Sequence, residues 1–320
     1  MKKPAFLITI DTEGDNLWRN RSGQVTTENA AWLARFQQLC EKYTFKPTWL
    51  TNYEMAVDPV YIDFARDVIA RGQGEVGMHL HAWNSPPAYE LTDNDWQHQP
   101  YLIEYPREEI RKKVAFMTEL LEETFNVKML SHRAGRWAFN EYYAQLLVEH
   151  GYRVDCSVTP GVNWRFSPGA PQGNGGTDYT HFPRSAYHPD SADISRPGNS
   201  PLLEVPMTIR YKHSGLMNAV KQGYDRLRGK RRSPSVYWLR PTGGNAQQMI
   251  DLAEKTLAEG ADYVEFMLHS SEFMPDGSPT FKTAADIDRL YDDLAQLFSW
   301  LQSRTHGMTL AEYAAAKAGT

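Results

Sequence analysis

Two histidines separated by one residue, His79 and His81, are the clearest chemical signal in this sequence of 320 residues. They end the stretch 75–81, which has the character of a β-strand, and residues two apart on a strand point to the same side. Adjacent imidazoles on one face can converge on one metal ion. Asp11 and Glu13 share this spacing at the end of the first predicted strand, so they can face one site together. The alternative is that all four are simply polar residues at a solvated strand end.

Polar residues end six of the predicted strands. In chain order they are Asp11 and Glu13, Thr51 and Asn52, His79 and His81, Arg133, Asp155, and His269. In (β/α) barrels, active sites are built at the carboxyl ends of the strands. Two histidines with a carboxylate also describe the iron-binding facial triad, but that motif usually begins with histidine and lies on an all-β fold. A hydrolytic zinc-type site, with three protein ligands and one open position, fits the pattern better.

Strands and helices alternate along the chain and must position these residues. Strands are predicted at 6–10, 47–51, 75–80, 128–131, 152–156, 202–209, 236–240 and 262–268, and helices at 28–43, 61–71, 106–125, 140–150, 245–259, 283–303 and from 309 onward. This alternation indicates a parallel sheet covered by helices. We predict a (β/α) barrel rather than a doubly wound sheet, because the acidic segment 11–15 stands where a phosphate-binding glycine turn would be.

The composition excludes several classes of protein. The apolar fraction of 41% and the charged fraction of 23% are typical of a folded domain. No apolar run approaches the ~20 residues of a membrane-spanning helix, and a net charge of −5 argues against a dedicated nucleic-acid binder. Two cysteines, Cys40 and Cys156, fit a reducing compartment, and the first apolar run is too short and too acidic for a signal peptide. We therefore expect a cytoplasmic protein with one catalytic domain over 1–320.

Two segments interrupt the regular pattern. Residues 160–201 contain six glycines and seven prolines, which predicts a long loop or insertion over about 157–201. Residues 210–232 contain eight lysines and arginines against one acidic residue. The simple interpretation of this basic segment is a solvated surface. The functional one is attraction to an anion, such as a phosphorylated or nucleotide-linked sugar, or to a membrane face that carries a lipid-linked glycan, which would imply peripheral membrane contact.

Five motifs give the chain a resemblance to a known family. They are TIDTEGD at 9–15, EVGMHLHAW at 75–83, RAGRW at 133–137, RVDCS at 153–157 and FMLHS at 266–270. With these five motifs in this order, the chain resembles the NodB-homology polysaccharide deacetylases, carbohydrate esterase family four. It resembles in particular the branch linked to O-antigen and capsule biosynthesis. The resemblance implies a distorted (β/α)7 barrel and metal-dependent removal of an N-acetyl group from a sugar or glycan, in the biosynthesis of lipopolysaccharide or another cell-surface polysaccharide.

The resemblance also assigns catalytic roles. Asp11 matches the family's catalytic base, and Arg133 matches the arginine that holds the carboxylate of that base. His269 matches a histidine that acts as general acid, and Asp155 matches the aspartate that orients it. Amide cleavage needs such an acid, because an amine departs very slowly unless it is protonated.

The first departure from the family concerns the carboxylate ligand of the metal. The usual motif has two adjacent aspartates, a base and then a ligand, but Thr12 occupies the second place here. The ligand must then come from Glu13 or, less favourably, from Asp15. Strand parity favours Glu13, because it points to the same side as the base.

Further departures concern the histidines and the third motif. His79 matches the first metal histidine, but Trp83 stands where the second is usual, so His81 must substitute for it. Gly135 replaces a proline, which should affect loop rigidity more than chemistry. Trp83 and Trp137 follow two motifs and are candidates for stacking on sugar rings, with ordinary packing as the alternative. The expected cofactor is a divalent metal, zinc first, with cobalt, nickel or manganese as alternatives.

Two other functions compete with the deacetylase. One is a small-molecule amidase on the same barrel, acting for example on ureides. The other is a non-catalytic glycan-binding module that has lost its metal, which the departures at Thr12 and Trp83 keep open. The residues that match a base and an acid argue against it, because a binding module needs neither. The sequence leaves the sugar, its linkage and the oligomeric state open.

Overall fold

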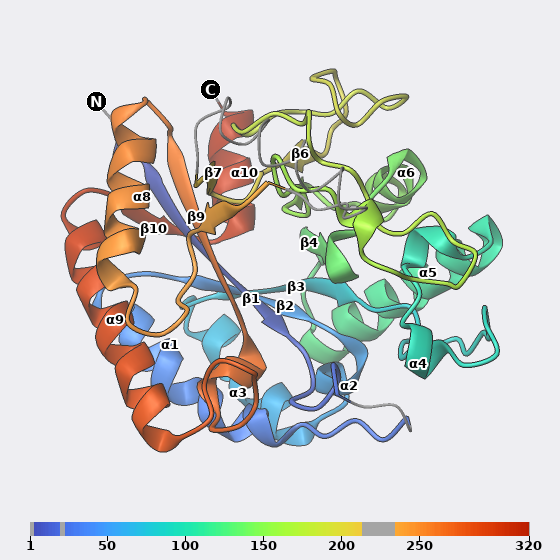
Figure 1. The fold of residues 1–320 in the computed structure, drawn as a ribbon, viewed down its shortest axis with the longest axis horizontal. Helices are drawn as coiled ribbons and strands as arrows, with labels where there is room; N and C mark the ends of the chain where they lie inside the picture. The colour runs from blue at the N-terminus through green and yellow to red at the C-terminus, as the bar shows by residue number, and fades with distance from the viewer. Residues whose placement is uncertain (1–2, 20–22, 213–233, 320) are drawn as a thin grey trace, which may run out of the picture.

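The computed structural model describes residues 3–19, 23–212 and 234–319. Within them, eight parallel strands form one curved sheet in the order β10-β1-β2-β3-β4-β5-β6, and the eighth strand, β9, also pairs with β1 (Figure 1). Strands β10 and β2 pair with successive parts of β1 along one edge, and β9 pairs along the opposite edge. Their bounds are β1 Ala5–Thr12, β2 Pro47–Thr51, β3 Glu75–Leu80, β4 Ser131–Ala134, β5 Val154–Asp155, β6 Leu203–Glu204, β9 Tyr263–His269 and β10 His306–Met308. A separate antiparallel pair joins β7 Ile209–Tyr211 to β8 Val236–Trp238.

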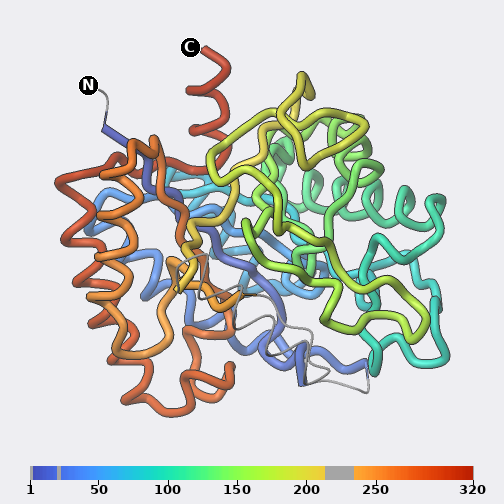
Figure 2. Tube along the Cα trace, turned by 45° about the horizontal axis from the view of Figure 1, so that its top comes forward, coloured from blue at the N-terminus to red at the C-terminus, as the bar shows by residue number. Residues whose placement is uncertain are grey.

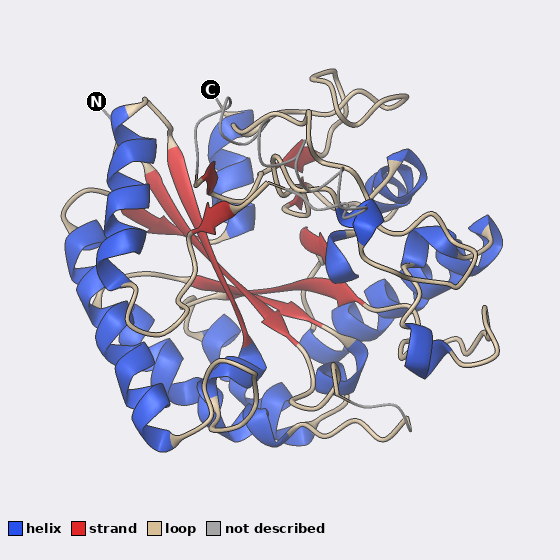
Figure 3. Ribbon diagram, in the orientation of Figure 1, coloured by secondary structure: helices blue, strands red, loops and turns tan. Residues whose placement is uncertain are grey.

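Helices surround the outer face of this sheet (Figure 3). The α-helices are α1 Leu33–Lys42, α2 Tyr53–Ala56, α3 Pro59–Ala70, α4 Asp95–His98, α5 Arg107–Phe125, α6 Glu141–Glu149, α8 Ala246–Ala258, α9 Ala284–Gln302 and α10 Leu310–Ala318. Short 3-10 helices are η1 Glu28–Trp32, η2 Leu102–Glu104, η3 Gly135–Trp137, η4 Trp164–Phe166 and η5 Ser270–Phe273. Among the described residues, no helix is both long enough and apolar enough to cross a lipid bilayer.

Strand β1 is the centre of the sheet and explains where the site lies. All eight of its residues are buried, as expected for a parallel strand covered on both faces. Its register places Asp11 beside His269 of β9 on one side and beside Leu50 of β2 on the other. The pairing of β3 with β4 places His79 beside Arg133. The carboxyl ends of the five parallel strands β1, β2, β3, β4 and β9 therefore meet at one edge of the sheet.

The sheet does not close through a regular strand ladder between β6 and β9. Extended backbone spans this side instead: Leu239 N donates to Thr208 O at 3.1 Å, and Met267 N of β9 donates to Leu239 O at 3.4 Å. The Thr208 hydroxyl accepts from Glu265 N at 2.8 Å. The fold is thus a distorted (β/α) barrel, and the predicted fold class is confirmed.

The glycine- and proline-rich segment between β5 and β6 is almost entirely irregular, as predicted. Its one helical turn is η4, and its backbone, drawn in yellow-green to yellow in Figure 2, runs beside α6. Phe139 N donates to the Thr177 hydroxyl at 3.0 Å, and Ala170 N donates to Glu104 at 3.0 Å. These bonds fix the segment against η2 and the start of α6. Of the predicted basic segment, residues 213–232 lie outside the described part of the chain.

Several predicted boundaries are wrong. The fourth strand is predicted over 128–131 but lies at Ser131–Ala134, because pairing with β3 carries a polar sequence into the sheet. The strand predicted over 202–209 is two short strands, since Pro206 has no N–H for the ladder. Strand β10 is missed; it is three residues long with glycine in the middle. The helix predicted over 28–43 begins as 3-10 helix η1.

Candidate active site

Three buried side chains converge at the carboxyl edge of the sheet: Glu13 after β1, His79 on β3 and His81 just beyond it. His81 Nε2 lies 2.8 Å from Glu13 Oε2 and 3.1 Å from His79 Nε2, and His79 Nε2 lies 3.7 Å from the same oxygen. Tetrahedral ligands at zinc distances lie about 3.3 Å apart. The three predicted metal ligands thus form one cluster at a spacing that suits one ion.

The neighbouring residues explain why Glu13, rather than Asp15, supplies the carboxylate. Asp15 is occupied outside the cluster, since its oxygens accept from the Thr26 hydroxyl at 2.5 Å and from Asn29 N at 3.3 Å. The Thr12 hydroxyl donates to the Ile10 carbonyl at 3.0 Å and points away from the cluster. Strand parity, which the sequence already indicated, therefore decides the position of the carboxylate.

Hydrogen bonding prepares His79 to bind a metal through Nε2. Its Nδ1 lies 2.9 Å from the Arg133 carbonyl, which only accepts, so Nδ1 must carry the proton. Nε2 then presents a lone pair to the cluster. A backbone carbonyl in this position is a common support for a metal-binding histidine.

The protonation of the cluster also suits a cation. Burial lowers the pKa of His81 to about 4, so this ring is neutral near pH 7. Burial opposes ionisation of Glu13, but hydrogen bonds from the two histidines outweigh it and hold its pKa well below its usual range. Nδ1 of His81 is buried and has no hydrogen-bond partner among the described residues. Burial would lower the pKa of His79, but Asp11 and Glu13 outweigh it and raise that pKa, so a cation would displace a proton from this ring. Two imidazole nitrogens and a carboxylate oxygen face each other here, which is the donor set that a divalent ion would satisfy.

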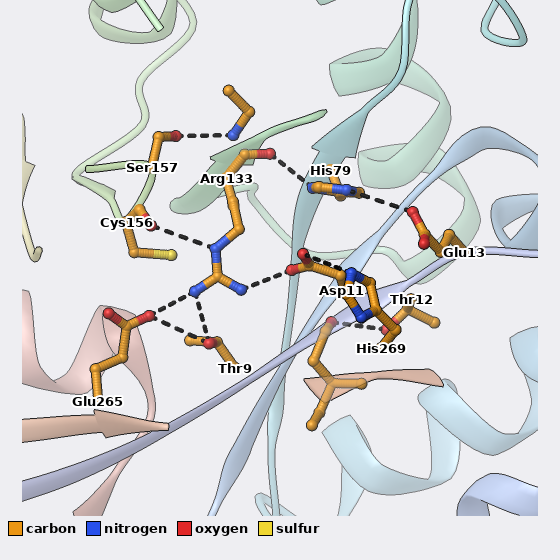
Figure 4. Close-up of polar contacts among 12 residues, drawn as sticks. Thr9, Asp11, Thr12, Glu13, His79, Arg133, Cys156, Ser157, Glu265 and His269 are labelled. Atoms are coloured by element: carbon orange, nitrogen blue, oxygen red, sulfur yellow. Dashed lines mark hydrogen bonds and ion pairs between the residues drawn. The ribbon is translucent and has the colours of Figure 1, made fainter. Parts of the chain in front are cut away.

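Asp11 lies beside the cluster and is held by Arg133 (Figure 4). Arg133 Nη1 donates to Asp11 Oδ1 at 2.6 Å, while Nη2 donates to Thr9 Oγ1 at 2.7 Å and to Glu265 Oε1 at 2.5 Å. All four side chains are buried. Burial alone would raise the pKa of Asp11, but the Arg133 guanidinium, with smaller effects of His79 and His269, lowers it. Asp11 is therefore an ionised carboxylate near neutral pH.

Glu265 is a member of this network that the sequence analysis missed. It is an acidic residue in the middle of the buried strand β9, and that position was the available signal. Burial raises its pKa to about 7, even though it contacts Arg133. Arg133 thus lies between two carboxyl groups, of which Asp11 is the more readily ionised.

His269 faces Asp11 across the site, and its orienting carboxylate is Glu272. His269 Nε2 lies 3.9 Å from Asp11 Oδ2, and its Nδ1 lies 3.1 Å from Glu272 Oε2. The same oxygen accepts from the His269 backbone N at 2.9 Å, and Arg240 donates to both Glu272 oxygens at 2.9 and 2.7 Å. Burial alone would lower the pKa of His269. Other effects outweigh burial and raise this pKa, and the largest of them is the hydrogen bond with Glu272.

The expected pairing of Asp155 with His269 is wrong. Asp155 Oδ1 lies 2.5 Å from Nδ1 of His132, and the other nitrogen of that ring lies 2.7 Å from the Tyr143 hydroxyl. The register of β4 with β5 places Asp155 directly beside His132. The signal for the true partner was the acid three residues after His269, the spacing of a capping box at the start of η5.

A cleft of about 770 Å³ opens onto Asp11, His79 and His269. Four aromatic side chains line it: Trp18, Tyr101, Trp137 and Trp164. Trp137, a predicted sugar-stacking residue, lies in this wall with its ring centroid 4.7 Å from the Arg133 guanidinium carbon.

Trp83, the other predicted stacking residue, is not part of the cleft wall. It is only 7% exposed and packs against His81, with ring centroids 4.5 Å apart. Its burial corrects the prediction that it stacks on substrate. Trp18, which the sequence analysis missed, is 39% exposed, and its indole N–H donates to Glu13.

Comparison with known proteins supports the fold. No protein-family model matches this chain, and a search of curated proteins found no match either. Among solved structures, a protein from Mycobacterium smegmatis that is presumed to be a polysaccharide deacetylase shares 14% identity at a TM-score of 0.54, over 100% of this chain and 92% of that one. A presumed glycoside hydrolase or deacetylase from Parabacteroides distasonis shares 12% identity at a TM-score of 0.64, over 99% and 72%.

A third similar structure is the 4-alpha-glucanotransferase from Thermococcus litoralis. It shares 13% identity at a TM-score of 0.56, and the match covers 98% of this chain but 40% of that enzyme. At these identities the similarity shows the fold alone. The chain has the barrel seen in presumed polysaccharide deacetylases, and the chemistry must be argued from its own residues.

Proposed function

We propose that this protein is a metal-dependent hydrolase that removes an N-acetyl group from a sugar. The observation that carries this proposal is the cluster of Glu13, His79 and His81 beside an ionised Asp11, with His269 across the same cleft. A ligand set, a base and an acid are the three components that metal-assisted amide hydrolysis requires.

Glu13, His79 and His81 would hold the ion, and their two nitrogens and one carboxylate oxygen fit zinc best. Cobalt, nickel and manganese are the alternatives. When bound, such an ion supplies Lewis acidity for the acetyl carbonyl and lowers the pKa of water. The remaining steps belong to side chains of this protein.

Asp11 acts as the general base. Arg133 fixes its Oδ1 at 2.6 Å and keeps the carboxylate ionised, while Oδ2 faces His269. An oriented carboxylate beside the ligand cluster can take a proton from attacking water. Because Arg133 also contacts Glu265, the position of Asp11 depends on a fully buried support.

His269 acts as the general acid. Glu272 accepts from its Nδ1, which directs Nε2 toward Asp11 and the cleft. The raised pKa favours the protonated form of this ring. The Nε2 proton can then pass to the departing nitrogen as the amide breaks.

The carboxylates favour amide hydrolysis over cleavage of a glycosidic bond. Glycosidases need one carboxylic acid that is protonated, with a raised pKa. The pKa of Asp11 is lowered, and Arg240 and His269 outweigh burial to lower the pKa of Glu272 to about 2. Neither Asp11 nor Glu272 is therefore suited to donate a proton to a glycosidic oxygen.

The aromatic wall supports a sugar substrate, since Tyr101, Trp137 and Trp164 offer apolar rings beside the reacting groups. We extend the proposal to the biosynthesis of O-antigen or another cell-surface polysaccharide, on the resemblance of the five sequence motifs. The sugar would then be carried on a nucleotide, a lipid or a growing glycan.

Metal content is the first test. Elemental analysis of the wild type should find about one divalent ion per chain, and His79→Ala should lose it. His98→Ala is a matched control, because this histidine lies on α4 and pairs with Asp93. Acetate release from N-acetyl sugars should follow the metal. A wild type that binds no metal in excess zinc would favour the non-catalytic glycan-binding module.

A further inference from the structure

Arg136 is a cation in the cleft that the proposed mechanism does not use. It lies in η3 after strand β4 and lines the same cavity as Asp11 and His269. Its Nη1 donates to the Gln99 carbonyl and its Nη2 to the Pro168 carbonyl, the latter at 2.8 Å. Its guanidinium carbon lies 4.0 Å from the ring centroid of Tyr101.

Among the described residues, Arg136 forms no salt bridge with a neighbouring side chain, and Glu104 acts on it only by Coulombic attraction at longer range. The other lysines and arginines of the cleft wall have carboxylate partners: Arg240 with Glu272, and Arg19 and Lys282 with Asp276. Arg136 has no carboxylate within 4.0 Å in the described ranges 3–19, 23–212 and 234–319. Carbonyl oxygens fix its direction but carry no formal charge. Burial outweighs the attraction of Glu104 and lowers the pKa of Arg136. A partly buried guanidinium without a salt-bridge partner is costly, and a bound anion would offset that cost.

The backbone at Arg136 is strained. Its φ is 55° and that of Trp137 is 62°, in the left-handed region that side-chain-bearing residues rarely adopt. Strain of this kind is concentrated at ligand-binding sites. The strained turn places both side chains in the cleft wall.

The contacts of this turn show where a ligand of Arg136 would lie relative to the reacting amide. The Trp137 ring covers Arg133, and Arg133 holds Asp11. Arg136, one residue further along the chain, packs against Tyr101 instead. A group bound by Arg136 would therefore lie beside the amide on which Asp11 and His269 act, on a neighbouring part of the same substrate.

We propose that Arg136 recognises an oxyanion, and that the N-acetylated substrate carries a carboxylate or phosphate near the amide. Two of the five guanidinium N–H donors are used by carbonyls, so three can bind such a group. Arginine matches both anions through paired hydrogen bonds. The substrate class rests on the proposed deacetylase function, whereas the anion site rests on Arg136 alone.

Binding of simple anions tests the site without any activity. Calorimetric titrations would use glucuronate, glucose 1-phosphate and neutral glucose against wild type and Arg136→Gln. Arg66→Gln is the matched control, because Arg66 also donates to a carbonyl, that of Thr124, but lies outside the cleft. We expect both anions to bind wild type better than glucose does, and Arg136→Gln to weaken them at least tenfold while Arg66→Gln leaves them unchanged.

Equal anion affinity in wild type and Arg136→Gln would overturn the inference, and so would anions that bind wild type no better than glucose. The stronger of the two anions identifies the source of the charge, an acidic sugar or a sugar phosphate. If Arg136→Gln does not fold, Arg136→Lys replaces it: it keeps the charge but loses the paired donors, so weaker binding of the carboxylate is expected and unchanged binding overturns the proposal.

Acetate release separates this inference from the proposed function. A hyaluronan tetrasaccharide, in which N-acetylglucosamine alternates with glucuronic acid, would be compared with a neutral N-acetylglucosamine tetramer. Arg136→Gln should lower kcat/KM at least tenfold for the acidic tetrasaccharide and leave the neutral one nearly unchanged, whereas a merely structural role would lower both alike. Turnover of neither sugar by the metal-loaded wild type would count against the deacetylase and leave the anion titrations standing.

Discussion

Two of the histidine–carboxylate pairs in the described part of the molecule lie in opposite environments. His269 pairs with Glu272 at 3.1 Å and is 22% exposed on the cleft side, whereas His132 pairs with Asp155 at 2.5 Å in the interior. In the first pair Arg240 donates a hydrogen bond to Glu272, and in the second the Tyr143 hydroxyl is hydrogen-bonded to Nε2 of His132. Only the first pair has a nitrogen free to meet a substrate.

The electrostatic difference between the pairs is as clear as the geometric one. Burial lowers the pKa of His132 and outweighs its contact with Asp155, so this ring is neutral. The pKa of His269 is raised despite burial, because Glu272 favours the charged ring. A carboxylate beside a histidine therefore does not by itself make an acid catalyst. The balance between burial and the carboxylate sets the charge of the ring, and access to the cleft decides its role.

Removing the imidazole of the cleft pair should have the largest effect on activity. His269→Ala deletes the proton donor, so kcat for acetate release should fall by about 10²–10⁴-fold. The side chain is partly exposed, so urea unfolding should change by less than about 1 kcal/mol. Wild-type kcat in His269→Ala would remove this histidine from the mechanism.

Removing the imidazole of the interior pair should act on stability instead. His132→Ala leaves the Asp155 carboxylate buried without its main partner, and the free energy of unfolding should fall by about 3 kcal/mol. Tyr143→Phe removes only the outer hydrogen bond and should cost about 1 kcal/mol. If His132→Ala is as stable as wild type but inactive, Asp155 and His132 belong to the catalytic machinery after all.

Features that depend on alternation along a strand and on the pairing of parallel strands could be predicted from the sequence. Features that depend on local turns were predicted less well. Asp11, Glu13, His79 and His81 follow from alternation along two strands, and all four lie where alternation places them. Parallel strands that end at one edge leave little freedom there, so the fold and the ligand cluster could both be anticipated.

The partner of His269 could not be obtained in this way. Asp155 ends a strand like the other site residues, but strand β5 is two residues long and its pairing turns this aspartate toward His132. Glu272 reaches His269 through a single turn of 3-10 helix, a local contact that strand alternation does not report. Glu265 carried a signal, an acid within an apolar strand, but its role follows only from the contact with Arg133 of a strand distant in the sequence.

A milder change tests the orienting role of Glu272. Glu272→Gln keeps a hydrogen-bond acceptor but removes the charge that raises the pKa of His269. Because the acid must be protonated, activity falls as pH rises through that pKa, so the basic limb of the pH–rate profile should move to lower pH. We expect kcat at neutral pH to fall about 10- to 100-fold. Asp155→Asn is the matched comparison, and its folded fraction should keep the wild-type profile.

The smallest expected effect is an opposite pH dependence of stability for the two pairs. The folded-state pKa of His269 is raised, so its contribution is full below the unfolded value near 6.5 and is lost as pH rises through the folded value. The folded-state pKa of His132 is lowered, so its contribution is present above 6.5 and is lost as pH falls toward the folded value.

Urea unfolding at pH 5.5 and pH 8 resolves the two signs. The stability gap between wild type and His269→Asn should be wider at pH 5.5, and the gap for His132→Asn should be wider at pH 8, each by up to about 1 kcal/mol. Gaps that change in the same direction would mean that both imidazoles have the same charge state in the folded protein. The contrast between a charged catalytic pair and a neutral structural pair would then fail, because that contrast requires Glu272 to outweigh burial at His269 while burial outweighs Asp155 at His132.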